Sequence, residues 1–143
     1  DSAKEKKEKG YQFSADAAAQ MQVLKGAICE ILDLTCRAYQ ENSIELAAQV
    51  EPLEQVIDGL ITKIRAGHVR RLRQGECSIE MGFVLADMLT NFERVSDHCS
   101  NIGGCVIEIA KYDALEMHKY NRKNHGSEYF EQMYKVYSSE YSI

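Results

Sequence analysis

Apolar residues recur at intervals of three and four along most of this chain, which is the period of an amphipathic α-helix. A serine that can cap a first turn stands where each repeat begins. We predict helices from Ser14 to about residues 40–42, from Ser43 to about residue 73, and from Ser78 to about residue 109. In the first helix, the predicted inward positions are Ala17, Met21, Leu24, Ile28, Ile31, Leu32, Thr35 and Tyr39. In the second helix they are Ile44, Ala47, Val50, Leu53, Ile57, Leu60, Ile61 and Ile64. In the third helix they are Ile79, Phe83, Ala86, Leu89, Phe92, Ser96, Cys99, Ile102, Val106 and Ile109.

Short connections between long helices make neighbouring helices antiparallel. The predicted fold class is therefore all-α, an antiparallel up-down-up three-helix bundle with a short C-terminal tail helix. Pro52 lies inside the second helix, where a proline removes a backbone donor and crowds the preceding turn. We expect either a kink there or a helix that becomes regular only after Pro52.

The end of the chain has a different character, because an aromatic stripe recurs there at helical spacing. Its members are Phe130, Met133, Tyr134, Tyr137 and Tyr141. We expect this tail helix to dock on its own bundle rather than on a second subunit or another domain. The predicted organisation is a charged linker at 1–10, the bundle at 11–112 and the tyrosine-rich tail at 113–143.

Composition bounds the function classes. With 45% hydrophobic and 27% charged residues, 143 residues form one globular domain. The net charge is −5 and the cations are scattered among acids, so we predict no nucleic-acid partner. No apolar run approaches the roughly 20 residues that span a bilayer, so we expect this chain itself to be soluble.

Five cysteines without a Cys-x-x-Cys pair predict reduced core thiols of a cytosolic protein, namely Cys29, Cys36, Cys77, Cys99 and Cys105.

Two acidic pairs are the candidate chemistry. Glu93 and Asp97 are four residues apart and share one helix face, and Glu54 and Asp58 repeat this spacing on the preceding helix. If the two helices face each other there, four carboxylates converge and repel unless a cation lies among them. Carboxylate oxygens suit Fe, Mn, Mg and Ca and also accept Zn. The alternative is a solvated face, or ion pairs of these acids with Arg94 or Lys63.

Two neighbours of the second pair are possible accessory ligands. His98 follows Asp97 but lies about 100° around the helix, so bundle packing or surface exposure is an equally open interpretation. Asn101 is four residues after Asp97, where it is either a ligand, a hydrogen-bond partner of a ligand, or an interhelical hydrogen-bonding group. No Glu-x-x-His motif and no nucleophile elbow are present, so we predict that the chain is not an enzyme.

Three segments together resemble the PhoU family. They are Leu53–Asp58, Gly67–Leu72 and Asp87–Ile102, and their order and spacing match over residues 14–112. The most specific part is the Glu-Arg-x-x-Asp-His-x-x-Asn-Ile stretch from Glu93 to Ile102. The resemblance implies a three-helix bundle whose acidic motifs can bind metal ions, here Glu54 with Asp58 and Glu93 with Asp97. Iron or zinc are the expected metals, and phosphate uptake is the expected context.

A full-length PhoU resembles two such bundles in tandem, whereas this chain has room for one. The single bundle and the lysine-rich start instead resemble the cytoplasmic C-terminal domain of bacterial sodium-dependent phosphate cotransporters. This resemblance implies a non-enzymatic regulatory domain, tethered to the inner face of the cell membrane, whose partners are the membrane portion of the transporter or phosphate-uptake proteins. The alternatives are a free-standing PhoU-like regulator that forms a homodimer, and a metal-free helical interaction module.

Overall fold

The computed structural model describes residues 15–113 and 128–143, and within these ranges the chain is helical and has no strand. The predicted linker at 1–10 and the proposed cap Ser14 lie outside the described residues. The prediction of an all-helical protein is confirmed. The helices are α2 Ala15–Glu41, α3 Ile44–Arg73, α4 Ile79–Asp113 and α6 Phe130–Glu140.

The connection between α2 and α3 is a tight turn in which two caps overlap. Asn42 has a φ of 50°, and the backbone N–H of Ser43 donates to the carbonyl of Ala38 at 3.0 Å. This is the bonding of a Schellman C-cap, in which a left-handed residue ends the helix. The Ser43 hydroxyl then accepts from the N–H of Leu46 at 3.1 Å, so the same residue begins α3, as predicted.

The connection between α3 and α4 is built in the same way. Gly75 has a φ of 73°, and the N–H of Glu76 donates to the carbonyl of Arg71 at 2.9 Å. Ser78 accepts from the N–H of Met81 at 3.1 Å and caps α4, as predicted. Both turns are short, so consecutive long helices reverse direction.

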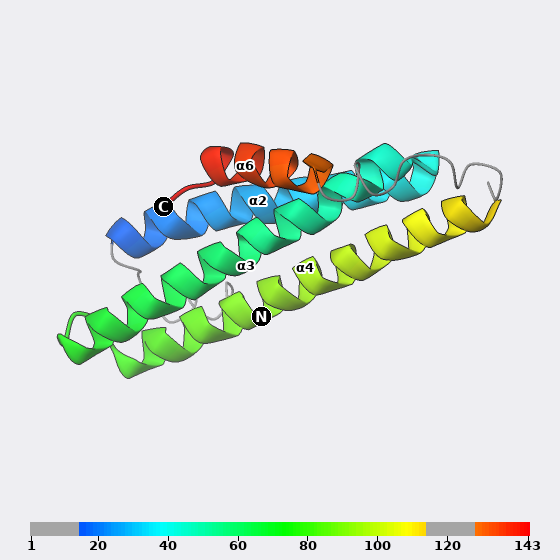
Figure 1. Ribbon diagram of the computed structural model, residues 1–143. Helices are drawn as coiled ribbons and strands as arrows, with labels where there is room; N and C mark the ends of the chain where they lie inside the picture. Colours follow the sequence, from blue (N-terminus) through cyan, green and yellow to red (C-terminus); the bar gives the residue numbers. More distant parts are fainter. Residues whose placement is uncertain (1–14, 114–127) are drawn as a thin grey trace.

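The three long helices run up, down and up, and each packs against the other two (Figure 1). Helix α3 is continuous through Pro52, which is itself buried, so the expectation of a helix that becomes regular only after this residue is wrong. The residues that fill the centre are mostly branched aliphatic side chains. The largest of them are Leu24, Ile31, Leu53, Ile57, Ile61, Ile64, Leu85 and Leu89.

Helix α6 docks on its own bundle, as predicted, beside α2 and α3 (Figure 1). Tyr137 is buried, and its hydroxyl donates to Gln49 Oε1 of α3 at 3.1 Å. The hydroxyl of Tyr141 donates to the carboxylate of Glu30 on α2. Burial, with the negative charge of Glu30, raises the pKa of Tyr137 to about 12, so the hydroxyl stays protonated and remains a donor.

Seven of the predicted inward positions face solvent. They are Leu32, Tyr39, Ile79, Phe83, Ala86, Ile102 and Ile109, and Phe83 is the most exposed of the large side chains at 73%. Helix α4 instead turns the face of Met81 and Leu85 inward. Phe83 lies two residues from each, about 200° around the helix, so these side chains cannot share one face.

The prediction of core thiols is wrong for most of the cysteines. Cys99 is buried, Cys77 is partly exposed, and the other three are exposed; all five are free. Each exposed cysteine is next to an inward residue in the sequence: Cys29 follows Ile28, for example, and Cys105 precedes Val106. A shift of one residue turns a side chain by about 100°, from the core to its rim.

Gly103 and Gly104 are adjacent on α4 and give a matched test of how closely α4 packs on α3. A Cβ on Gly103 would lie 3.2 Å from Cβ of Val50, whereas a Cβ on Gly104 would meet no described residue within 4 Å. Gly104→Ala is therefore expected to raise the unfolding free energy by about 0.5–1 kcal/mol through its higher helix propensity. Gly103→Ala is expected to be less stable than Gly104→Ala by about 1 kcal/mol or more, because it crowds α3. Urea denaturation measures both, and equal gains would contradict the packing.

Candidate functional site

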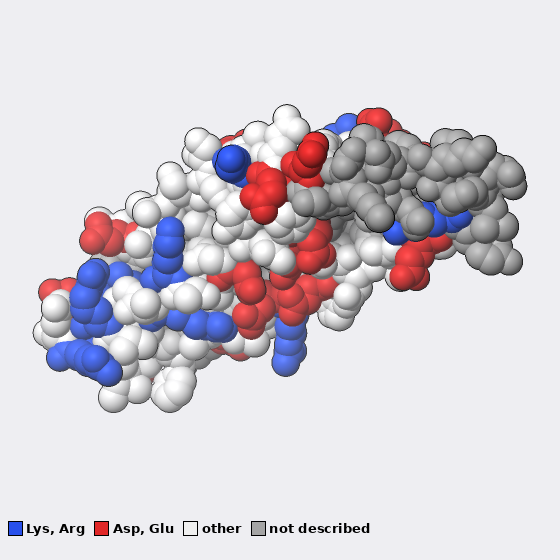
Figure 2. Space-filling model, in the orientation of Figure 1, with Lys and Arg blue, Asp and Glu red and all other residues white. Residues whose placement is uncertain are grey.

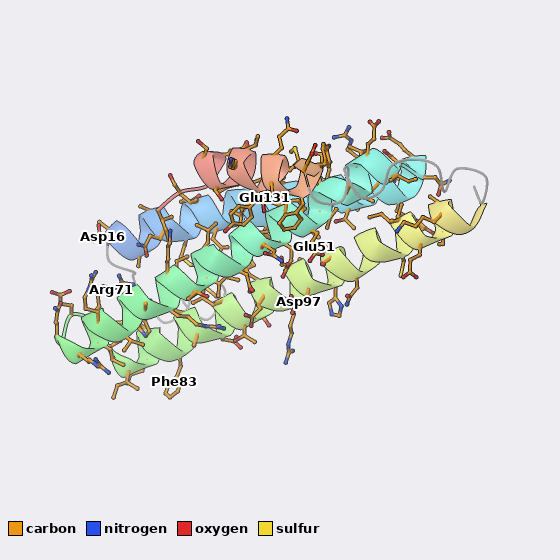
Figure 3. The ribbon with its side chains drawn as sticks, viewed as in Figure 1. Asp16, Glu51, Arg71, Phe83, Asp97 and Glu131 are labelled. Carbon is orange, nitrogen blue, oxygen red and sulfur yellow. The ribbon has the colours of Figure 1, made fainter. Side chains whose placement is uncertain are left out.

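The acidic side chains of α3 and α4 meet at the middle of the interface between these helices. Figure 2 shows them as a group over this region, and Figure 3 shows Glu51 and Asp97 on the same face. Glu54 is the half-buried member, and it shares a side-chain hydrogen bond with Asp97 across the interface. The structure therefore brings Glu54, Asp58 and Asp97 together, three of the four carboxylates that the sequence offers.

The crowding of these acids has a measurable electrostatic consequence at Glu54. Burial, followed by the negative charges of Asp58, Glu51 and Asp97, raises the pKa of the Glu54 carboxyl to about 7. The hydrogen bond with Asp97 acts in the same direction, because it places a proton between the two carboxyl groups. The site therefore carries an excess of negative charge, which the protein relieves by retaining a proton at pH values below about 7.

Glu51 is a member of the cluster that the sequence interpretation missed. Its Oε2 atom accepts from the hydroxyl of Ser100 on α4 at 2.8 Å, which is a second polar bond between the two helices. Glu51 precedes Glu54 by three residues, a spacing that also places side chains on one helix face. That spacing was the signal that could have found it.

Glu93 takes part in a different interaction. Arg65 of α3 lies between two residues of α4, with Nη1 at 3.7 Å from Glu93 Oε2 and Nη2 donating to Thr90 Oγ1 at 3.3 Å. Thus Arg65 supplies the counter-charge, rather than Arg94 or Lys63. Both side chains are partly exposed, at 42% and 37%, and their N–O distance is long, so the ion pair contributes little to stability.

The two possible accessory ligands lie at the surface of α4. His98 and Asn101 are both exposed. In the described part of the chain, no group of three or more His, Cys, Asp and Glu side chains is arranged to hold a metal ion. The cluster thus has the oxygen donors that a divalent cation accepts, but binding through three of them requires the side chains to change rotamer on their helices.

No described helix is both long enough and apolar enough to cross a membrane.

The raised pKa of Glu54 predicts a pH-dependent cost to folding. The unfolded chain ionises this carboxyl at a lower pH than the folded chain, so its contribution to stability falls as pH rises toward 7 and is lowest above 7. Glu54→Gln is therefore expected to stabilise the protein by about 1–2 kcal/mol at pH 8, a value discounted for solvent screening, and little at pH 4.5.

Urea denaturation with a chelator present measures this effect at both pH values. Glu108→Gln is the matched control, because it removes one exposed carboxylate from α4 outside the cluster. An equal effect of the two variants at pH 8 would show that net charge, not crowding, is responsible.

Comparison with known proteins gives a family for this arrangement. The family model described as "PhoU domain" matches residues 22–106, which contain both acidic pairs and all of α3. A relative in Thermotoga maritima, "Phosphate-specific transport system accessory protein PhoU homolog 1", is 32% identical over 84 residues, which are 59% of this chain and 36% of that protein. The match thus spans about a third of the relative's length, and no solved structure matches the chain. Because the family model covers more than half of the sequence, the chain belongs to the PhoU domain family.

Proposed function

We propose that this chain is a non-enzymatic domain that regulates phosphate transport. The observation that carries the proposal is the match of the PhoU domain model across residues 22–106, the part of the chain that forms most of the bundle. The relative's name describes an accessory protein of a phosphate-specific transport system. Such a role requires binding to other components rather than bond-making chemistry, and a rigid helical bundle provides suitable faces for binding.

We propose further that the acidic cluster binds a metal ion, with iron or zinc as the expected metals. Glu54, Asp58 and Asp97 would hold the ion, and Glu93 would join them by leaving Arg65. Asn101 and His98 are the accessory candidates. The support is the local excess of negative charge, which a divalent cation would neutralise more completely than the one retained proton.

The metal proposal predicts saturable binding that depends on the cluster. Purified protein dialysed against Zn²⁺ or Fe²⁺ is expected to retain metal by elemental analysis and to unfold at a higher temperature, because a ligand of the folded state stabilises that state. Glu54→Gln with Asp97→Asn is expected to lose both effects.

The control for this pair of changes is Asp33→Asn with Glu41→Gln. It removes the same charge from α2, where both acids pair with the exposed Arg37. Retention of no metal by the unchanged protein, or equal retention by the cluster variant, would overturn the metal site and leave the regulatory proposal standing.

The cellular context that we propose is the cytoplasmic domain of a sodium-dependent phosphate cotransporter, tethered to the inner face of the membrane. A free-standing regulator that forms a homodimer accounts for the family match equally well. The reading frame upstream of Asp1 separates the two: hydrophobic spans favour the cotransporter, and a start codon directly before Asp1 favours the free-standing regulator.

In either context, the full-length protein carrying Glu54→Gln and Asp97→Asn is expected to change how phosphate uptake responds to external phosphate. Uptake of radiolabelled phosphate by cells measures this, with immunoblotting to show equal protein levels. Unaltered uptake both in this variant and in cells lacking the whole gene would contradict a role in phosphate transport.

A further inference from the structure

A thiol and an imidazole face each other at the hairpin between α3 and α4, away from the acidic cluster. The Sγ atom of Cys77 lies 3.7 Å from Nδ1 of His68, which is within hydrogen-bonding distance for sulfur. The same thiol is 3.4 Å from the carbonyl oxygen of Ser78. Of these two acceptors only the imidazole is a base that can take the thiol proton away.

The His68 ring is fixed in this position by its neighbours. A Cβ on Gly82 would lie 2.9 Å from Nε2, so the ring packs directly against the backbone of α4. Burial, together with the positive charge of Arg71, lowers the pKa of His68. The imidazole is therefore predominantly neutral at pH 7 and keeps a free lone pair for a proton.

Arg71 is the second unusual feature of this end of the bundle. It is only 6% exposed, and its buried Nη2 atom has no hydrogen-bond partner among the residues that the structure describes. A buried guanidinium is costly unless a negative charge compensates it. Cys77 also directly precedes the cap of α4, where the positive end of the helix dipole favours an anion. The charge of Arg71 thus acts at His68 and the helix end acts beside Cys77, so both members of the pair lie in positive potential.

We propose that Cys77 is a modification site, a thiol that reacts with small electrophiles such as hydrogen peroxide while His68 accepts its proton. In the reaction with peroxide the sulfur attacks one oxygen, an S–O bond forms and the O–O bond breaks. The sulfur is oxidised to a sulfenic acid, and the peroxide is reduced to hydroxide, which takes up the proton from His68 to give water. The site is separate from the acidic cluster and does not depend on the proposed function.

The other cysteines provide an internal reference. Cys29, Cys36 and Cys105 are more exposed than Cys77, so accessibility alone would make them react faster. Cys99 is buried, and burial raises the pKa of its thiol, so it is expected to react slowest. If His68 activates Cys77, then Cys77 reacts faster than the three exposed cysteines although it is less accessible.

The test uses limiting hydrogen peroxide, trapping of sulfenic acid with dimedone, and peptide mass spectrometry of all five cysteines. Cys77 is expected to be trapped at least about fivefold faster than each of the three exposed cysteines, since general-base assistance is typically larger than this. His68→Gln is expected to remove that advantage. Glu108→Gln, which changes an exposed side chain of α4 outside both the hairpin and the acidic cluster, is expected to leave it unchanged.

Denaturation supplies a further measurement that does not depend on a variant. In urea the five thiols are expected to react at similar rates, because the contact between Cys77 and His68 is lost. A rate for Cys77 equal to or below those of the exposed cysteines in the folded protein would overturn the proposal, and so would an advantage that survives His68→Gln or urea.

Discussion

The close approach of α3 and α4 is the constraint on which the polar features of this protein depend. Two glycines of α4 allow it, because they leave room for side chains of α3. Val50 packs against Gly103 near one end of the α3–α4 interface, and the His68 ring packs against Gly82 near the other end. Between these contacts the helices are near enough for carboxylates to meet across the interface. A bulkier residue at either glycine would separate the helices and dilute the charge that accumulates between them.

The helices and their ends could be predicted from the sequence, because the signals are local. The period of the apolar residues gives each helix, and Ser43 and Ser78 cap α3 and α4 with their own hydroxyls. Local sequence does not decide which apolar residue faces inward. Phe83 and Leu85 are both apolar, and only the packing of α4 on its neighbours selects Leu85.

The acidic cluster could be predicted only in part, for a related reason. Spacing within one helix places Glu54 with Asp58, and Asp97 faces them because the turn is short and the helices antiparallel. The partner of Glu93 is decided across the interface, where Arg65 reaches it from α3. The contact of Cys77 with His68 also crosses an element boundary and follows no motif, so periodicity could not reveal it.

The charges along α3 are distributed in a way that helix stability alone does not explain. Arg70, Arg71 and Arg73 occupy the last turn, where cations interact favourably with the helix dipole. Glu54 and Asp58 lie in the middle of the helix, where the dipole contributes nothing, and they face a third acid on α4. Their crowding costs folding energy that a polar neutral side chain would avoid, which is the pattern expected where a site is kept for binding rather than for stability. The hairpin end repeats this pattern with opposite sign, since the buried guanidinium of Arg71 has no partner for Nη2 within residues 15–113 and 128–143. The bundle tolerates both because its stability rests on the aliphatic core among α2, α3 and α4, to which none of these charged side chains belongs.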